Sequence, residues 1–191
     1  MACRLSRYLF ILLCGVLLGP QAEAQFFELG LSANYRQTTI DSDNYGQSLS
    51  LTGSFSYYFS ALSAIEFSYT EGLGQEGFES VIEGSIKTRT TFRLVGADLV
   101  LSFAEREQTF QPFIKVGIAH VKKERFLQPE GQFEQRVANQ EGTVPSGGIG
   151  FRYRLTETLS FKFGLDAWTT PLDEDPVTID TAGRAGVSWF F

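Results

Sequence analysis

Residues 47–59 read QSLSLTGSFSYYF, and their apolar and polar side chains alternate with a period of two. The apolar positions are Leu49, Leu51, Phe55, Tyr57 and Phe59, whereas positions 48, 50, 52, 54 and 56 hold only serine or threonine. Because successive side chains of a strand point to opposite sides, this stretch predicts a β-strand with one apolar face and one face of small polar groups.

The same alternation recurs along the chain, with little helical periodicity between the repeats. We expect strands at about 26–38, 47–59, 64–70, 94–103, 112–119, 148–155, 159–166 and 177–191. The links after the second, fourth and sixth strands are short, and those at about 40–46, 71–90, 122–146 and 170–176 are longer. Four prolines fall in the longer links: Pro129, Pro145, Pro171 and Pro176. An even number of antiparallel strands places both ends of the mature chain on the side of the short turns.

The first 24 residues have the organisation of an export signal. Arg4 and Arg7 precede an apolar run at 8–18, and Ala22-Glu23-Ala24 provides a small-x-small cleavage site. An apolar run of this length is too short to span a bilayer as a helix, which needs about 20 residues. The alternatives are an uncleaved anchor and a lipoprotein modified at Cys14. We expect residues 1–24 to be a cleaved signal peptide and residues 25–191 to form one domain.

Charge and cysteine content exclude several classes of function. Without residues 1–24, 14 Lys and Arg face 21 Asp and Glu, a net charge of −7. This balance argues against nucleic-acid binding, which needs a basic face. Both cysteines, Cys3 and Cys14, lie in the signal, so the mature chain has no disulfide and no cysteine-ligated metal. We expect no cofactor.

The chemistry of the two faces distinguishes a membrane barrel from a soluble one, which alternates too but turns its apolar face inward. The polar face here is rich in Gly, Ser and Thr, with single charges of both signs spaced along it. The predicted lumen charges are Glu28, Arg36, Glu66, Asp98, Lys115, Arg152, Arg154, Lys162, Asp166, Asp180 and Arg184. We expect these charges to pair across a narrow interior, with the glycines leaving room for their stems.

Aromatic residues of the apolar face collect near the short turns. They are Phe27, Tyr57, Phe59, Phe67, Phe103, Tyr153, Phe161, Trp189 and Phe191. The core aromatics of a β-sandwich would instead scatter along the strands. The clustering is typical of an interfacial girdle on a membrane barrel. A thinner girdle at the other end is expected from Tyr35, Tyr69, Phe92 and Trp168. The predicted fold is therefore all-β: an eight-stranded, antiparallel, up-and-down transmembrane β-barrel with short periplasmic turns and longer external loops.

The last seven residues, AGVSWFF, form an amphipathic strand that ends in Phe191. With the signal peptide and eight strands, the chain resembles the small outer-membrane barrels of the OmpA/OmpX/OmpW type. The resemblance implies a place in the outer membrane of a Gram-negative bacterium. It also implies that Trp189 and Phe191 form an assembly signal read by the barrel assembly machinery. The implied partners are outer-membrane lipids and lipopolysaccharide.

Residues outside the lumen offer three further hypotheses. The single histidine, His120, is predicted at the outer end of a strand, but Lys122 stands where a similar lipid A deacylase has a serine. The acidic run 173–175 could bind a divalent cation or be a solvated loop tip. The segment 122–125, Lys-Lys-Glu-Arg, could meet lipopolysaccharide phosphates or be an exposed charged loop. We therefore predict no enzyme and no metal site.

Two classes of function remain. The first is a structural or interaction barrel with a plugged lumen and external loops that contact partners or lipopolysaccharide. The alternative is a conduit for small apolar solutes, and a lipid-A-modifying enzyme ranks below both. Salt bridges that cross the lumen would favour the first, and a lined cavity beside a gap in the wall would favour the second. The external partner and the oligomeric state do not follow from the sequence.

Overall fold

The computed structural model describes residues 26–39, 45–80, 84–129, 135–169 and 179–191. The predicted signal peptide, the acidic run 173–175 and the prolines at 171 and 176 lie outside these residues. Within them, no helix is long and apolar enough to cross a membrane.

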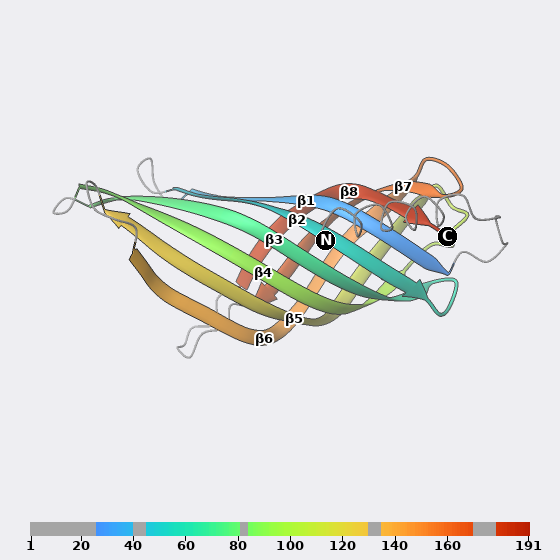
Figure 1. The fold of residues 1–191 in the computed structure, drawn as a ribbon. Helices are drawn as coiled ribbons and strands as arrows, with labels where there is room; N and C mark the ends of the chain where they lie inside the picture. The colour runs from blue at the N-terminus through green and yellow to red at the C-terminus, as the bar shows by residue number, and fades with distance from the viewer. Residues whose placement is uncertain (1–25, 40–44, 81–83, 130–134, 170–178) are drawn as a thin grey trace, which may run out of the picture.

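Eight strands form one closed barrel in which each strand pairs antiparallel with its sequence neighbours and β8 pairs with β1 (Figure 1). The strands are β1 (Phe27–Thr39), β2 (Tyr45–Tyr58), β3 (Ser63–Ser80), β4 (Gly84–Ser102), β5 (Phe110–Pro129), β6 (Gln135–Arg154), β7 (Leu159–Thr169) and β8 (Ile179–Phe190). The expectation of an all-β, eight-stranded, antiparallel up-and-down barrel is confirmed.

The short turns lie at one end of the barrel together with the C-terminus, at the right of Figure 1. They comprise residues 59–62, 103–109 and 155–158. At this end the last residue closes the wall onto the first strand. The Phe191 N–H donates to the Phe27 carbonyl at 2.9 Å, and the Phe27 N–H donates to the Phe191 carbonyl at 3.3 Å.

The segments expected as long loops after β3 and β5 are largely strand, which corrects the sequence prediction. Residues 71–80, 84–90, 122–129 and 135–146 all belong to paired strands, including Pro145 within β6 and Pro129 at the end of β5. Their alternation was missed because both faces of these extensions carry polar residues. Backbone pairing holds a hairpin together without an apolar face, so periodicity of hydropathy does not reveal it.

These extensions form a sheet that we call the flange: residues 72–80, 84–92, 123–129 and 135–145. The flange projects at the left of Figure 1, past the ends of β7 and β8. Pairing between β6 and β7 runs only from Ser146 to Arg154. Among the strands that the structure describes, residues 135–145 therefore pair with β5 alone.

The two faces of the wall carry the residues that the alternation assigned to them. The outward face exposes large apolar side chains such as Leu51, Leu99 and Val116, whereas Glu28, Glu66 and Asp98 are buried inside. Aromatic side chains crowd the outer face near the turns. Their ring contacts include Phe27 with Phe55 at 5.6 Å and Phe110 with Phe151 at 5.3 Å.

The thinner aromatic girdle at the other end needs a correction. Phe92 and Trp168 point inward and pack against a buried apolar cluster of Leu94, Ala119, Val121 and Val144. Trp168 is in phase with the inward Asp166 and Lys162. Strict alternation along β7 therefore excludes it from the outer face.

Candidate functional site: the barrel lumen

Four acidic and four basic side chains meet inside the barrel, and we call this group of eight the ionic network. Its members are Glu28, Glu66, Asp98, Lys115, Arg152, Lys162, Asp166 and Arg184. They come from seven of the eight strands, every one except β2. The four positive and four negative charges balance, so the network has no net charge, as buried ions in a poorly hydrated interior require.

Glu66 is the centre of the network. Its side chain is fully buried, and it contacts Lys162, Lys115 at 3.7 Å and Arg184 at 3.5 Å. Ser56 donates a further hydrogen bond to Glu66 at 3.3 Å. One carboxylate thus connects cations from β5, β7 and β8 across the whole width of the lumen.

Lys115 forms a second junction. Its ammonium lies 2.8 Å from Asp166 and 3.7 Å from both Asp98 and Glu66. Gly148 stands directly beside this group, because a Cβ there would lie 2.9 Å from Lys115 Cε and 2.7 Å from Asp166 Oδ1. A glycine at this position therefore leaves room for the ion pair.

The turn end of the network rests on aromatic rings. Tyr58 donates to Glu28 at 2.5 Å, and Arg152, which donates to Glu28 at 3.2 Å, lies over the Phe113 ring at 4.8 Å. Tyr58, Phe113 and Phe190 belong to one buried cluster. Tyr58 and Phe190 each follow an aromatic residue, and the alternation alone could have assigned both to the inner face.

Three of the predicted lumen charges lie apart from the network. Arg154 belongs to the turn end, where it donates to the carbonyls of Arg106, Thr156 and Glu157. Arg36 and Asp180 pair nearer the flange, at 2.5 Å. Lys123 also pairs with Asp180 from β5. The hypothesis that Lys123 lies in an exposed loop is therefore wrong, since its side chain is only 11% exposed and faces inward.

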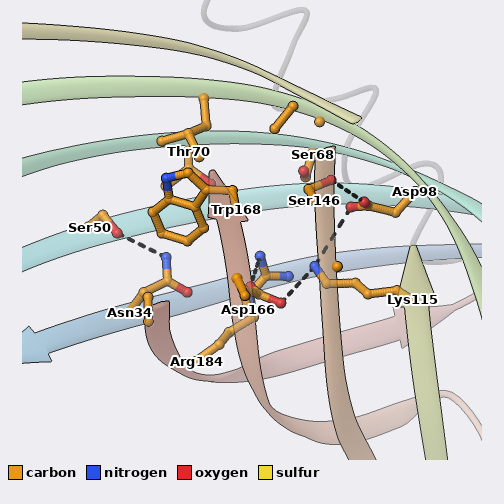
Figure 2. A pocket seen from close by; sticks show the side chains of 16 residues that line it. Asn34, Ser50, Ser68, Thr70, Asp98, Lys115, Ser146, Asp166, Trp168 and Arg184 are labelled. Atoms are coloured by element: carbon orange, nitrogen blue, oxygen red, sulfur yellow. Dashed lines mark hydrogen bonds and ion pairs between the residues drawn. The ribbon is translucent and has the colours of Figure 1, made fainter. Parts of the chain in front are cut away.

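A small cavity lies between the ionic network and the Arg36–Asp180 pair. Its volume is about 40 Å³, which is room for about three water molecules at roughly 10–15 Å³ each. Asp98, Lys115, Asp166 and Arg184 form its floor (Figure 2). Ser146 donates to Asp98 at 2.8 Å on the same side.

The cavity reaches the barrel wall between β6 and β7. Gly147 and Ala167 line it and are cross-strand partners. The next pair, Ser146 with Trp168, is the last one that joins these two strands. The cavity therefore lies beside the point where the pairing of β6 with β7 ends.

His120 faces outward and has a hydroxyl partner that the sequence did not reveal. Thr143 lies directly opposite it on β6, with Oγ1 3.1 Å from His120 Nδ1. On the other side of the ring, His120 Nε2 lies 3.3 Å from Glu141 Oε1. This hydrogen bond and the charge of Lys122 lower the pKa of Glu141. The His120 and Glu141 side chains are about half exposed, and Lys122 is 41% exposed on the outer face.

A second charged pair, Arg93 with Glu71 at 3.1 Å, also lies on the outer face. Arg93 is the cross-strand neighbour of Lys122, and Lys122 is the neighbour of Glu141. The outer faces of β3 to β6 thus change from apolar to charged where the flange begins. No group of His, Cys, Asp and Glu within the described residues is arranged to hold a metal ion.

Comparison with known proteins assigns the barrel to a family. The model of the outer membrane protein β-barrel domain matches residues 8–191. The chain belongs to this family. None of the curated proteins compared with the chain matches its sequence.

Solved structures with the same fold include other barrels of outer membranes. The N-terminal barrel domain of Pseudomonas aeruginosa OprF is 18% identical, with a TM-score of 0.59 over 87% of this chain and 98% of that one. Neisserial surface protein A is 15% identical, with a TM-score of 0.59 over 86% and 97%. OprG of Pseudomonas aeruginosa is 13% identical, with a TM-score of 0.59 over 88% and 96%. At such low identity the likeness concerns the fold alone.

Proposed function

We propose that this outer membrane β-barrel is an interaction protein, in which the barrel is the membrane anchor and the flange is the contact surface. The observation behind the proposal is the flange itself, which extends past β7 and β8 with one edge of β6 unpaired among the described strands. Unpaired backbone N–H and C=O groups on such an edge can add an extended segment of another polypeptide as a further strand.

The lumen supports an anchoring role. The ionic network crosses it from seven strands, and Val100 and Phe113 fill the space nearer the turns. Eight strands enclose an interior only wide enough for side chains or one small ligand. A barrel filled in this way is suited to holding the flange at the membrane surface rather than to general diffusion.

The lipid contacts of the proposal involve the outer charged residues. Arg93 and Lys122 lie next to each other at the membrane end of the flange, about half exposed. Cations at this level suit the phosphate groups of lipopolysaccharide. We also infer that residues 1–24 direct export and are removed before Gln25, and that the barrel assembly machinery reads Trp189 and Phe191.

Peptide binding tests the flange. Purified barrel in detergent is applied to an array of extended heptapeptides, and Asn139→Pro and Gln140→Pro are compared with the wild type. Alternate N–H groups of β6 point toward β5 and toward its other edge, so one of the two prolines removes only a donor of the unpaired edge. We expect that variant to keep its heat-modifiable gel mobility and to lose peptide binding.

Thr143→Val is the matched control, because it changes a side chain of the same strand and leaves the backbone donors intact. It should bind peptides as the wild type does. Peptide binding that survives both proline substitutions, or that is absent from the wild type, would contradict the proposed role of the flange.

A conduit for small solutes is a second candidate, favoured by one specific observation. The lumen cavity reaches the wall at Gly147 and Ala167, beside the end of β6–β7 pairing. Solutes would enter from the flange end and leave sideways, because the ionic network closes the route toward the turns. Uptake by proteoliposomes of a solute that binds in the cavity tests this candidate. If such a solute binds but is not taken up, the candidate is rejected.

A further inference from the structure

We propose that the lumen cavity is a binding site for a small uncharged molecule that carries a hydroxyl or a primary amide group. The inference deepens the conduit candidate by naming a ligand class. It is tested by binding rather than by passage, so the two can fail separately.

The charge of the cavity floor excludes ionic ligands. Lys115 and Arg184 face Asp98 and Asp166, and these four side chains are already paired with one another. A charged ligand would have to compete with these internal partners, and its own charge would be buried without compensation. An uncharged molecule meets no such cost.

The walls of the cavity differ in chemistry across the lumen. Asn34, Ser50, Ser68 and Thr70 line it from β1, β2 and β3. Leu94, Ala119 and Trp168 line it from β4, β5 and β7. Figure 2 shows the Trp168 ring facing the polar side chains across the space. Such walls suit a molecule with one hydrogen-bonding end and a short apolar part.

Three residues of the lining carry buried polar atoms without a hydrogen-bond partner: Asn34 Oδ1, Trp168 Nε1 and Arg184 Nε. Asn34 is 5% exposed, and its Nδ2 donates to Ser50 at 3.0 Å and to Thr52 at 2.8 Å. These two bonds fix the amide, so that its oxygen is the atom left unused. Buried polar groups are normally paired, and three unpaired atoms on residues that line the same cavity indicate a missing partner.

The unpaired atoms define what that partner must supply. Asn34 Oδ1 needs a donor, whereas Trp168 Nε1 and Arg184 Nε need an acceptor. A hydroxyl or a primary amide offers both within a few atoms. The cavity of about 40 Å³ limits the bound part to a small fragment.

Intrinsic fluorescence provides a direct test. The chain has two tryptophans, so Trp189→Phe leaves Trp168 as the single reporter beside the cavity. The folded variant is titrated in detergent with acetamide and 1-propanol, and with acetate and propylammonium as charged counterparts of similar size. We expect a saturable change in Trp168 emission with the uncharged probes and at least a tenfold weaker response with the charged ones.

Substitutions then locate the site. In the Trp189→Phe background, Asn34→Leu should weaken binding at least tenfold. Ala119→Phe, which fills the cavity, should abolish it. Ser32→Ala is the matched control, because Ser32 is another buried polar residue on the inner face of β1 but does not line the cavity. All variants are compared only if they keep heat-modifiable mobility.

A linear, non-saturable response to every probe would overturn the proposal. So would saturable binding that both Asn34→Leu and Ala119→Phe leave unchanged. If the probes bind but proteoliposomes do not take them up, the binding site stands and the conduit candidate falls.

Discussion

Glu66 illustrates what a single residue does in this barrel. Its carboxylate is buried without exposure and serves three cations from three strands. A buried ion pair stabilises little relative to an apolar core, but removing one partner leaves uncompensated charge. At the scale of the residue, the stability of the lumen therefore depends on every buried charge having a partner more than on the strength of any one ion pair.

Glu66→Gln tests this dependence. The amide keeps the shape of the carboxylate but leaves Lys115, Lys162 and Arg184 with an excess of positive charge. We expect a loss of about 3–5 kcal/mol in the free energy of unfolding, measured by denaturant titration in bilayers. Glu71→Gln, which breaks the exposed pair with Arg93, is the control and should change the free energy of unfolding far less, because water screens this pair. Equal effects of the two substitutions would contradict the central role of Glu66.

The hydroxyl, imidazole and carboxylate of Thr143, His120 and Glu141 resemble a hydrolytic triad in connectivity. We expect them to act as a polar cluster at the membrane surface, because water competes for the hydrogen bonds of the exposed ring and carboxylate. Hydrolysis of phospholipid and p-nitrophenyl esters by the purified barrel should stay at background, and His120→Ala should not change it. Hydrolysis by the wild type that His120→Ala or Thr143→Val abolishes would reverse this expectation.

The strands show the same face rule throughout but serve two environments. Along β3 the outward residues are Ile65, Phe67 and Tyr69 and then Glu71, where the charged pair with Arg93 begins. The apolar outer face therefore ends before β3 does, and the flange continues the same strand into water. At the scale of the element, the backbone pairing of a strand continues past the point where its outer face changes from apolar to charged.

Two substitutions locate the bilayer on these strands. Leu99 faces outward on β4 among apolar neighbours, so Leu99→Arg should cost about 2–4 kcal/mol near the membrane centre. Leu73 also faces outward but lies beyond Glu71, and Leu73→Arg should cost about 1 kcal/mol or less. Folding titrations into lipid vesicles measure both. A cost at Leu73 as large as that at Leu99 would place the flange inside the membrane.

The whole molecule is closed in two senses, around its wall and across its lumen. The wall closes where Phe191 and Phe27 exchange backbone hydrogen bonds. The lumen closes where the ionic network joins β1 to β6 and β7, β5 to β7, and β3 to β7 and β8. Each closure predicts a different measurement.

Deletion of Phe191 should lower the amount of barrel in the outer membrane sharply, because it removes two closing hydrogen bonds and the residue that we propose the assembly machinery reads. Refolding of the purified chain into detergent separates these effects, since the assembly machinery is absent there. We expect refolding to suffer much less than assembly in cells. Normal amounts and normal gel mobility in cells would contradict the assembly role of Phe191.

Lumen closure predicts little or no stable ion conductance from the monomer in planar bilayers. The buried side chains of the ionic network lie between the cavity and the turns, so we expect no continuous water-filled path there. Glu66→Gln, which loosens the network, should raise the frequency of brief openings and serves as the positive comparison. Large and persistent conductance from the wild type would contradict the closed lumen and the anchoring role built on it.

The amino-acid sequence by itself predicted the number of strands and the inward face of most of the lumen charges, whereas Arg154 lies at the turn end and the inward Lys123 was missed. These features follow from a period of two, which is a local property of the chain, as residues 47–59 show. Lumen aromatics such as Tyr58 and Trp168 were within reach of the same rule.

Only the tertiary structure decided which charges meet, where the flange projects and where the cavity lies. Arg152 and Glu28 are 124 residues apart, and Lys162 and Glu66 are 96 apart. Their meeting depends on the register of eight strands and on the closure of the wall. The hydropathy pattern of a segment contains no information about either. The flange escaped detection for a related reason, since paired backbone groups hold it together while polar residues on both of its faces, among a few apolar ones such as Leu73 and Val144, interrupt the alternation. Pairing across distance is a property of the closed barrel, not of any segment within it.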